Sequence, residues 1–347
     1  WTLVVFLAAW LGAAAGTAGA APAGPGDFSL AMADRTGTGY YYESVVVTSS
    51  IVYVAAGHGL DVISVVNPNL VVPLNRLNTN GSVNAIDIEG SRAYLACSDG
   101  LRILDITDVL DPVPIGYYPT SSSISDVDVA GTVAYATSGG YSLQILNVSN
   151  PATVTRVGFI NFPGVPHAVR KLGNYCYVAN DTYGLRVINV SDPTAPSLVS
   201  VCDTPGMALD LCLLVSLPAG YWALVADNQG GLQIITIFDP ANPTIVGSLD
   251  TTGYTRQVAA TSSYAYLAEY SVSNGIKIVD ISNKTAPALA GQANARYGPC
   301  GVAINGGFAY LCEQDGGLEV VDVDPPTAPA ARGCYDASFA PDEIDVE

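Results

Sequence analysis

Apolar and polar residues follow one block pattern that recurs seven times between residues 53 and 326. Each copy has an aromatic or aliphatic anchor, a short aliphatic and alanine run, a polar loop, a second aliphatic run and, in most copies, Asn or Asp before proline. The copies are YVAAGHGLDVISVVNP (53–68), YLACSDGLRILDITDVLDP (94–112), YATSGGYSLQILNVSNP (135–151), YVANDTYGLRVINVSDP (177–193), LVADNQGGLQIITIFDP (224–240), YLAEYSVSNGIKIVDISNK (266–284) and YLCEQDGGLEVVDVDPP (310–326). The anchors are Tyr53, Tyr94, Tyr135, Tyr177, Leu224, Tyr266 and Tyr310, which are 41, 41, 42, 47, 42 and 44 residues apart. A near-constant period of this length indicates a repeat architecture.

Turn signals divide each repeat into four expected strands, which in the second repeat span 85–88, 93–96, 101–106 and 113–117. The second and third of these are nearly continuous apolar runs, a pattern typical of strands buried on both faces. A propeller blade packed between two neighbouring blades provides that environment. Solenoids of the leucine-rich type have periods of about 20–29 residues, whereas about 42 residues and four short strands match a propeller blade. We therefore predict an all-β fold, a seven-bladed β-propeller of four-stranded antiparallel blades over residues 39–347.

The third-strand segments LRILDIT, LRVINVS, IKIVDIS and LEVVDVD resemble the LVIVD repeat family, over roughly residues 40–347. The resemblance implies a β-propeller on exported bacterial or archaeal proteins, and it implies no particular activity. The Gly-His and Trp-Asp markers of WD40 repeats are not present at aligned positions.

The last residues, Glu343–Glu347, resemble the first strand of a blade, Ala85–Glu89. This segment would either help to close the ring or begin a further unit. We favour seven blades, with eight as the alternative.

Residues 1–20 are apolar, carry no charge and include an Ala-Gly-Ala pattern at residues 18–20. These features are typical of a signal peptide, so we expect a signal-like apolar helix here and an exported, extracellular or cell-surface protein. A retained membrane anchor and a helix that packs in an assembly are the alternatives; a membrane span is expected only if residues 1–20 are retained. Residues 21–38 are rich in Ala, Gly and Pro and are expected to be a linker.

The formal net charge is −18, from 31 acidic and 13 basic residues. Such a surface repels nucleic acids and anionic membranes, whose affinity for proteins depends on basic residues. It attracts cations such as Ca²⁺ or basic partners, although acidic residues also serve simply to maintain solubility.

The seven cysteines show no CxxC spacing, so the usual zinc pattern is absent. We expect small buried apolar side chains rather than a disulfide framework, with a local Cys202–Cys212 bridge as one alternative.

Propeller geometry places the loop after strand two and the loop before strand one on the same face, at the mouth of the central channel. A ring of acidic residues there could hold Ca²⁺ through oxygen ligands, or bind a cationic ligand; ordinary solvated loop acids are the alternative, and otherwise no cofactor is expected. The candidate binding residues are Asp99, Asp181, Asp227, Glu269, Glu313, Asp315, His58, His167 and Arg256, with Tyr254 and Tyr297 on the same face.

Strand one offers Asp87, Asp128, Arg170 and Asp210 at positions that we predict to be equivalent. These residues either line the channel or form hydrogen bonds to neighbouring blades. The Asn-x-Ser sequences at Asn147 and Asn189 are interpreted as turns before they are interpreted as glycosylation sites.

Catalytic motifs are absent: the two histidines show no metal-ligand spacing, and no nucleophile-elbow, P-loop or Rossmann pattern occurs. We therefore expect a non-enzymatic binding or scaffold module whose propeller face engages a protein or a polysaccharide. A structural subunit of a surface layer or fibre, and a secreted hydrolase or lyase that uses carboxylates at the channel mouth, are the alternatives.

Overall fold

The computed structural model describes residues 42–79, 81–216, 220–270, 275–314 and 317–337, all within one compact unit, Gly37–Glu347. The apolar helix predicted at 1–20, the linker predicted at 21–38 and the strand-like segment Glu343–Glu347 lie outside the described residues. Among the described residues, no helix has the length and apolar composition that a bilayer span requires.

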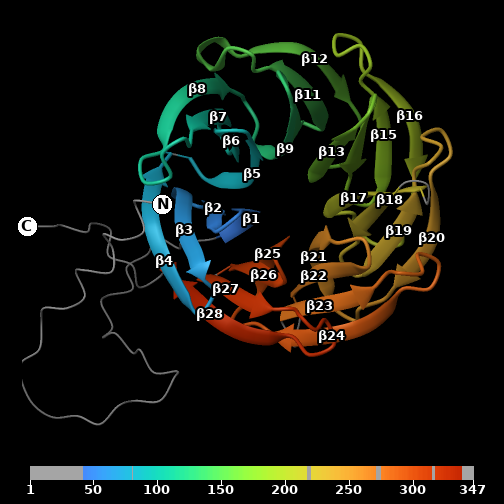
Figure 1. Ribbon diagram of the computed structural model, residues 1–347. Coiled ribbons are helices and arrows are strands. Elements are labelled where there is room, and N and C mark those ends of the chain that lie inside the picture. The colour runs from blue at the N-terminus through green and yellow to red at the C-terminus, as the bar shows by residue number, and fades with distance from the viewer. Residues whose placement is uncertain (1–41, 80, 217–219, 271–274, 315–316, 338–347) are drawn as a thin grey trace, which may run out of the picture. The chain divides into compact units, whose positions relative to one another are not determined.

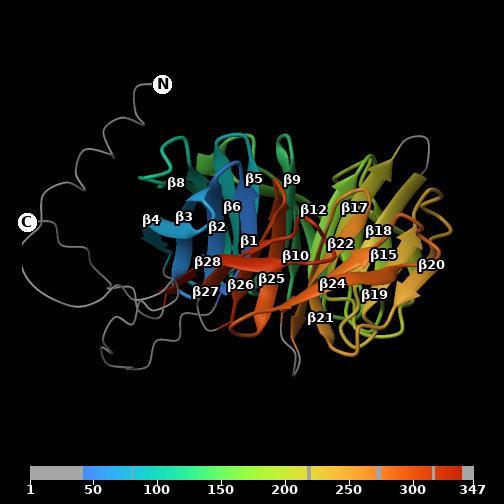
Figure 2. The ribbon, with the colours of Figure 1, turned by 60° about the horizontal axis from the view of Figure 1, so that its bottom comes forward.

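The strands form seven four-stranded antiparallel sheets, and each sheet consists of four strands that are consecutive in the sequence. Figure 1 shows the sheets as blades around a central axis, with the first strand of each blade innermost and the fourth outermost. Figure 2 shows the same blades standing side by side when the ring is tilted. The predicted seven-bladed β-propeller is thus confirmed.

Each blade occupies one stretch of the chain. Blade 1 contains β1 (Tyr42–Thr48), β2 (Ile51–Ala56), β3 (Gly59–Asn67) and β4 (Leu70–Asn78); blade 2 contains β5 (Val83–Glu89), β6 (Arg92–Cys97), β7 (Gly100–Asp105) and β8 (Val113–Pro119). Blade 3 contains β9 (Ile124–Ala130), β10 (Val133–Ser138), β11 (Ser142–Asn147), the 3₁₀ turn η1 (Pro151–Thr153) and β12 (Thr155–Asn161); blade 4 contains β13 (Ala168–Leu172), β14 (Tyr175–Ala179), β15 (Leu185–Asn189) and β16 (Ser197–Cys202). Blade 5 contains β17 (Asp210–Ser216), β18 (Gly220–Ala226), β19 (Leu232–Thr236) and β20 (Thr244–Leu249); blade 6 contains β21 (Tyr254–Ala260), β22 (Tyr264–Tyr270), β23 (Gly275–Asp280) and β24 (Ala288–Asn294); blade 7 contains β25 (Pro299–Asn305), β26 (Phe308–Glu313), β27 (Gly317–Asp322) and β28 (Ala330–Asp336).

The apolar core lies between neighbouring blades. Tyr53 and Leu60 of blade 1, for example, pack in one cluster with Leu95 and Leu104 of blade 2. The second and third strands supply most of this core because both of their faces are covered, as their unbroken apolar sequences predict. The turn after the third strand is held by an Asp or Asn side chain that accepts a backbone hydrogen bond two residues on, as Asn147 does from Ser149 and Asn189 does from Ser191.

The outer strands meet the next blade at one repeated contact. In five blades the residue of the fourth strand at this contact is a glycine: Gly116, Gly158, Gly247, Gly291 and Gly333. At each of these glycines, an added Cβ would overlap a backbone carbonyl in the turn of the following blade. In blade 4 the equivalent Ser200 donates its hydroxyl to the Pro240 carbonyl at 2.6 Å, and in blade 1 Asn75 Nδ2 donates to the Leu110 carbonyl at 2.8 Å. The contact of Gly333 is with Pro68, so blade 7 meets blade 1 in the same way as the other neighbours meet.

The ring closes by packing of whole blades. Tyr42 and Val54 of blade 1 share a buried cluster with Tyr310 and Leu318 of blade 7. Among the described strands, none completes the sheet of a blade at the other end of the chain. Within the described residues, the seam between blades 7 and 1 is therefore formed by side-chain and turn contacts.

Candidate functional site

A β-bulge opens the inner strand on the face where the predicted site lies. In blades 1, 2, 3, 6 and 7 one residue of the inner strand has no partner in the second strand: Glu43, Asn84, Ser125, Arg256 and Cys300. In blades 4 and 5, His167 and Leu209 occupy the same place, directly before the first ladder pairs Ala168–Ala179 and Asp210–Ala226. A bulge leaves one residue out of the ladder and redirects its side chain.

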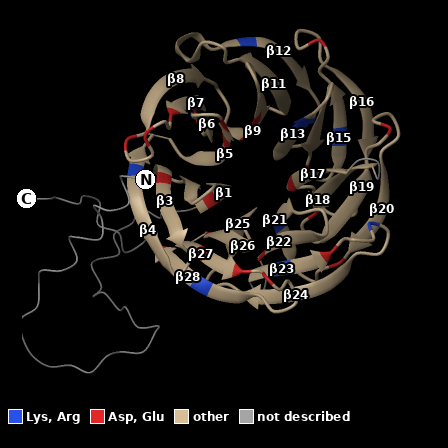
Figure 3. Cartoon of the chain, in the orientation of Figure 1, with Lys and Arg blue, Asp and Glu red and all other residues tan. Residues whose placement is uncertain are grey.

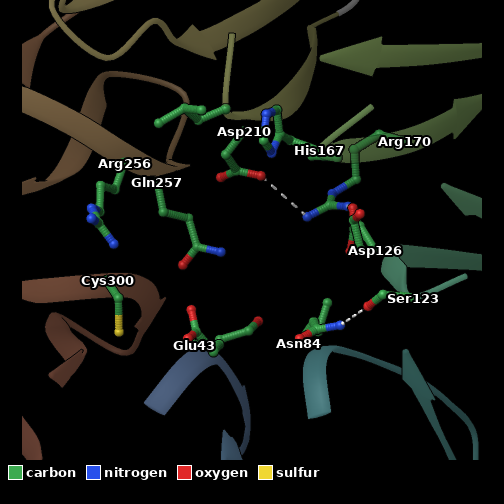
Figure 4. Close-up of a pocket in the computed structure, with 15 residues that line it drawn as sticks. Glu43, Asn84, Ser123, Asp126, His167, Arg170, Asp210, Arg256, Gln257 and Cys300 are labelled. Carbon is green, nitrogen blue, oxygen red and sulfur yellow. Dashed lines mark hydrogen bonds and ion pairs between the residues drawn. The ribbon is translucent and has the colours of Figure 1, made fainter. Parts of the chain in front are cut away.

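All seven of these residues, which we call the bulge ring, line one central cavity of about 320 Å³. Figure 4 labels five of them around a common opening, together with Asp126, Arg170, Asp210 and Gln257; the five are Glu43, Asn84, His167, Arg256 and Cys300. Seven residue types occupy the seven equivalent positions. In five blades the ladder does not constrain this position, whereas in blades 4 and 5 the backbone N of His167 and of Leu209 donates to the second strand. All seven residues line the cavity, and Asn84 Nδ2 is already engaged by Ser123 Oγ and the Ile124 carbonyl.

Beneath the bulge ring, acids and an amide of the inner strands join neighbouring blades. Asp126 accepts a hydrogen bond from the backbone N of Val169 at 2.8 Å, Asp210 from Val258 at 3.0 Å, and Gln257 from Val302 at 2.6 Å. Two positions further along, Asp87 and Asp128 accept from Val129 and Lys171, both at 2.7 Å. These contacts support the predicted alternative that strand-one acids hydrogen-bond to neighbouring blades.

The prediction that Asp210 is equivalent to Asp87, Asp128 and Arg170 is wrong. Asp210 pairs with Ala226 at the start of its strand, level with Asp126 opposite Thr137. The residue level with Asp128 in blade 5 is Cys212. The insertion before β18 lengthens the interval between the first strand of blade 5 and its anchor Leu224. Our alignment of this strand with those of the other repeats was therefore two residues out of register.

Arg170 of blade 4 lies between an acid of blade 3 and an acid of blade 5 along the channel wall. Its Nη1 lies 2.5 Å from Asp126 Oδ2 and its Nη2 lies 3.7 Å from Asp210 Oδ1. Burial raises the pKa of Asp210 to about 6 although Arg170 opposes the rise, and burial likewise raises the pKa of Asp128 to about 6. The deeper part of the channel is lined mainly by apolar side chains, including Val46, Leu211 and Ile304.

A second cavity of about 640 Å³ opens on the same face and shares Glu43, His167, Leu209, Arg256 and Cys300 with the first. Its other lining residues are Asn228, Tyr254 and Tyr270. The guanidinium of Arg256 lies over the Tyr270 ring, 4.9 Å from the centroid. Tyr254 and Tyr270 are direct partners in the β21–β22 ladder and are 43% and 41% exposed.

The channel mouth carries both acidic and basic side chains. Burial lowers the pKa of His167, an effect that Asp181 partly opposes. Burial raises the pKa of Glu43, and Arg256 partly opposes that change. Among the described residues, no carboxylate forms an ion pair with Arg256, whereas Arg170 contacts two.

Of the nine predicted binding residues, His167 and Arg256 line the two cavities. Most of the other predicted binding residues form hydrogen bonds or ion pairs with residues of their own blade or of the adjoining loop. Asp99 forms a two-bond ion pair with Arg102 at 2.5 and 2.8 Å, and the hydrogen bonds from Arg102 hold the pKa of Asp99 below its ordinary value. His58 Nε2 lies 2.9 Å from Asp61.

The three buried acids among the predicted binding residues also accept hydrogen bonds from nearby residues. Asp227 accepts hydrogen bonds from Thr204 Oγ1 at 2.6 Å and from the backbone N of Gly206 at 2.8 Å. Glu269 accepts from Thr255 and lies 3.8 Å from Lys277 Nζ. Glu313 accepts from the backbone N of Tyr297 at 3.1 Å, and burial raises the pKa of Glu313 to about 7.

Asp181 has φ of 49° and forms an isolated backbone bridge with Ala208 of the next blade. Asp315 lies outside the described residues. Figure 3 shows acidic residues spread over loops and inner strands around the ring. Across the part of the chain that the structure describes, no group of three or more His, Cys, Asp or Glu side chains is placed to hold a metal ion.

Sequence reasoning missed five members of the bulge ring: Glu43, Asn84, Ser125, Leu209 and Cys300. A signal was available, because the bulge residue precedes the anchor by ten residues in six blades, as Glu43 precedes Tyr53 and Cys300 precedes Tyr310. An alignment of the repeats at this offset would have found every member except Leu209, which the insertion in blade 5 displaces.

The cysteines are largely the buried apolar side chains that were predicted. Cys97, Cys176, Cys300 and Cys312 are buried, Cys202 and Cys212 are half-buried, Cys334 is exposed, and all seven are free thiols. The bridge considered between Cys202 and Cys212 is not formed, because Cys202 is on the outer strand β16 and Cys212 on the inner strand β17 of the next blade.

Comparison with known proteins agrees with the fold. Crystal structures of the RRP9 WD40 repeats and of the Mitotic Checkpoint Complex contain similar chains: the first has a TM-score of 0.63 at 14% identity over 79% of this chain and 88% of that one, and the second has a TM-score of 0.67 at 11% identity over 88% and 98%. A computationally designed protein matches with a TM-score of 0.60 at 10% identity over 82% and 97%. At these identities the likeness shows the fold alone.

No curated protein matches the chain. The model of the LVIVD repeat matches residues 80–120, 123–161, 167–204, 215–251, 252–295 and 299–337, which are the six blades that follow the first. With six consecutive matches over most of its length, this chain belongs to the LVIVD repeat family.

Proposed function

We propose that this LVIVD propeller is a non-enzymatic binding module of the cell exterior, and that the channel mouth lined by the bulge ring is its recognition site. The observation that carries the proposal is the bulge ring itself, in which each blade contributes a different side chain to one cavity. Ligand sites are concave and combine apolar walls with a few polar groups that converge. Export is inferred from the signal-like sequence of residues 1–20.

The ligand that the mouth fits best is a carboxylate-bearing polysaccharide. Arg256 carries a guanidinium that forms no ion pair with a described carboxylate, although its charge acts on Glu43, and guanidinium and carboxylate pair through two parallel hydrogen bonds. Tyr254 and Tyr270 present exposed rings beside it. Aromatic rings bury large apolar area and leave a hydroxyl free for hydrogen bonding, which suits the faces and edges of sugar rings.

Glu43 opposes such a ligand because it lines the same two cavities. Burial raises the pKa of its carboxyl, so the repulsion is relieved at a less acidic pH than it would be for an exposed glutamate. The two residues therefore make opposite contributions to the affinity, and this difference can be tested with a pair of variants.

The experiment is titration calorimetry with trigalacturonate, and with galactotriose as the neutral analogue. We expect saturable binding of the acidic trimer only. Arg256→Gln should weaken it about 10- to 100-fold, since hydrogen bonds to charged groups contribute about 1.5–3 kcal/mol. Glu43→Gln should strengthen it.

Arg156→Gln is the matched control, because Arg156 also lies over an aromatic ring, Phe159 at 4.6 Å, but on the outer strand β12. Its affinity should equal that of the parent. Equal binding of the neutral trimer would disprove the carboxylate specificity, and no saturable binding to either trimer or to a broad glycan array would disprove the recognition site. Cleavage products in the same mixtures would instead favour the hydrolase or lyase alternative.

A further inference from the structure

Two of the seven thiols lie side by side in blade 7. Cys300 is the bulge residue of β25 and Cys312 is the residue of β26 that pairs with the next residue, Gly301. Their Sγ atoms are 3.3 Å apart. Among the described cysteines, this is the one pair whose sulfur atoms are in contact.

The two thiols differ in their access to solvent. Cys300 lines both cavities at the channel mouth and keeps 7% of its surface exposed, so a small molecule that enters the mouth lies against this residue. Cys312 is fully buried, and burial raises the pKa of its thiol well above the ordinary range. A thiolate reacts and a thiol does not, so Cys312 is protected from direct attack by reagents in solution.

The contacts of Cys300 place it at the seam where the ring closes. Its Sγ lies 2.7 Å from the backbone carbonyl of Tyr42 in blade 1 and 3.1 Å from that of Cys312 in its own blade. In the thiol form, Cys300 can therefore donate its proton across the seam between blades 7 and 1.

We propose that Cys300 and Cys312 are a dithiol that forms a disulfide when a low-molecular-weight disulfide enters the channel mouth. A disulfide requires the sulfur atoms to approach to about 2.05 Å, a movement of the order of 1 Å from their present positions. Other cysteines of the chain do not meet this requirement: Cys202 and Cys212, for example, lie on the outer and inner strands of different blades.

The chemistry balances with an external disulfide as oxidant. The Cys300 thiolate attacks one sulfur of oxidised glutathione, forms a mixed disulfide and releases one glutathione thiolate. The Cys312 thiol gives its proton to the glutathione thiolate released in the first exchange, and its sulfur then attacks Cys300 Sγ. The second glutathione leaves as a thiolate and takes up a proton equivalent to the one that Cys300 lost to water. The protein loses two protons and two electrons, and the oxidant becomes two molecules of reduced glutathione.

The disulfide changes the mouth in two ways. It removes the S–H donor that faces the Tyr42 carbonyl, and it fixes the bulge of β25 to β26. One wall of the cavity then presents a covalent link in place of a movable thiol, so the oxidation state sets the shape of the bulge ring in blade 7.

The experiment treats the folded protein with oxidised glutathione, blocks the remaining thiols with iodoacetamide after unfolding, and counts the labels by mass spectrometry. The untreated protein should take seven labels, one for each cysteine of the sequence. The bridge should remove two of these labels, and a glutathione adduct on the exposed Cys334, which adds mass, is counted separately. Chymotrypsin cleaves after Phe308 or Tyr310 and separates the two cysteines, so a linked pair of peptides identifies the bond.

Single variants distinguish the roles of the two thiols. Cys312→Ser should retain one glutathionyl group on Cys300, because the second thiol that displaces it is missing. Cys300→Ser should show neither an adduct nor a bridge at Cys312, because that thiol is enclosed.

The double variant Cys202→Ser/Cys212→Ser is the matched control and should still form the bridge. An unlinked Cys300 and Cys312 in the treated parent protein, or a Cys312→Ser variant without the adduct, would overturn the proposal. None of these measurements depends on the carbohydrate ligand, so the two proposals succeed or fail separately.

Discussion

At the residue scale, one polar position on each third strand supplies an ion-pair partner to two of the predicted loop acids. The equivalent residues are Asp61, Arg102, Gln144, Arg186, Gln233, Lys277 and Glu319. Arg102 binds Asp99, and Lys277 lies beside Glu269. The loop acids could be identified from the sequence. Their partners could not, because each is a single polar residue within an aliphatic run. Asp99 and Glu269, which we had expected to face the channel mouth, therefore form ion pairs within their own blades.

The buried carboxyl of Asp210 should make stability depend on pH. Its pKa in the folded protein is about 6, and the ordinary value for aspartate is about 3.9. Between these two values the folded state binds more protons than the unfolded state, so stability increases as the pH falls from about 7 towards 4. The contribution of Asp210 is at most about 3 kcal/mol.

Asp210→Asn should therefore reduce the gain in Tm between pH 7 and pH 5, as measured by calorimetry. Asp128, with a pKa of about 6, and Glu313, with a pKa of about 7, change stability in the same direction and should preserve part of the gain. Asp239→Asn is the control, because hydrogen bonds, first from Asn242, lower the pKa of this exposed residue to below the tested range. A pH profile of the Asp210 variant identical to that of the parent would show that Asp210 does not titrate in this window.

At the element scale, the hydrophobic pattern determined the strands well. The strands expected at 85–88, 93–96, 101–106 and 113–117 differ from β5, β6, β7 and β8 by at most two residues at either end. Burial on two faces leaves a clear signature in sequence. A bulge adds one unpaired residue without changing that signature, so the bulge ring was not predicted even though its blades were.

Replacing a core residue of the third strand should be costly. Ile103 is fully buried, and Ile103→Ala should lower the free energy of unfolding by about 2–5 kcal/mol through lost burial and the resulting cavity. Leu110→Ala, at a residue that is 57% exposed, should change it by less than about 0.5 kcal/mol. Urea denaturation measures both, and a small effect at Ile103 would contradict its place in the core.

At the scale of the whole molecule, six seams join blades that are consecutive in the chain, and the seventh joins blade 7 to blade 1. That seventh seam is held by the contact of Gly333 with Pro68, by Asn305 Nδ2 donating to the Ser49 carbonyl at 2.6 Å, and by Arg76 Nη2 donating to the Tyr335 hydroxyl at 3.2 Å. We expect this seam to open first, because its two blades are not consecutive in the chain, whereas a covalent connection joins the blades at each of the other six seams.

Gly333→Ala tests that expectation. The new methyl group would overlap the Pro68 carbonyl, and overpacking of this kind typically costs about 1–3 kcal/mol. Hydrogen exchange should then accelerate in β1–β4 and β25–β28 more than in β13–β16. Gly139→Ala, where the nearest atom would be 3.7 Å away, should leave exchange unchanged. Uniform acceleration in all blades would mean that the ring unfolds as one unit.

The bulge ring also has an evolutionary consequence. A residue that takes no part in the ladder can be exchanged without loss of backbone pairing, and five of the seven blades supply such a residue to a shared opening. Specificity can therefore diverge by single substitutions in separate repeats while the scaffold is conserved. A related propeller with identical architecture and different residues ten positions before its anchors would then be selective for a different molecule.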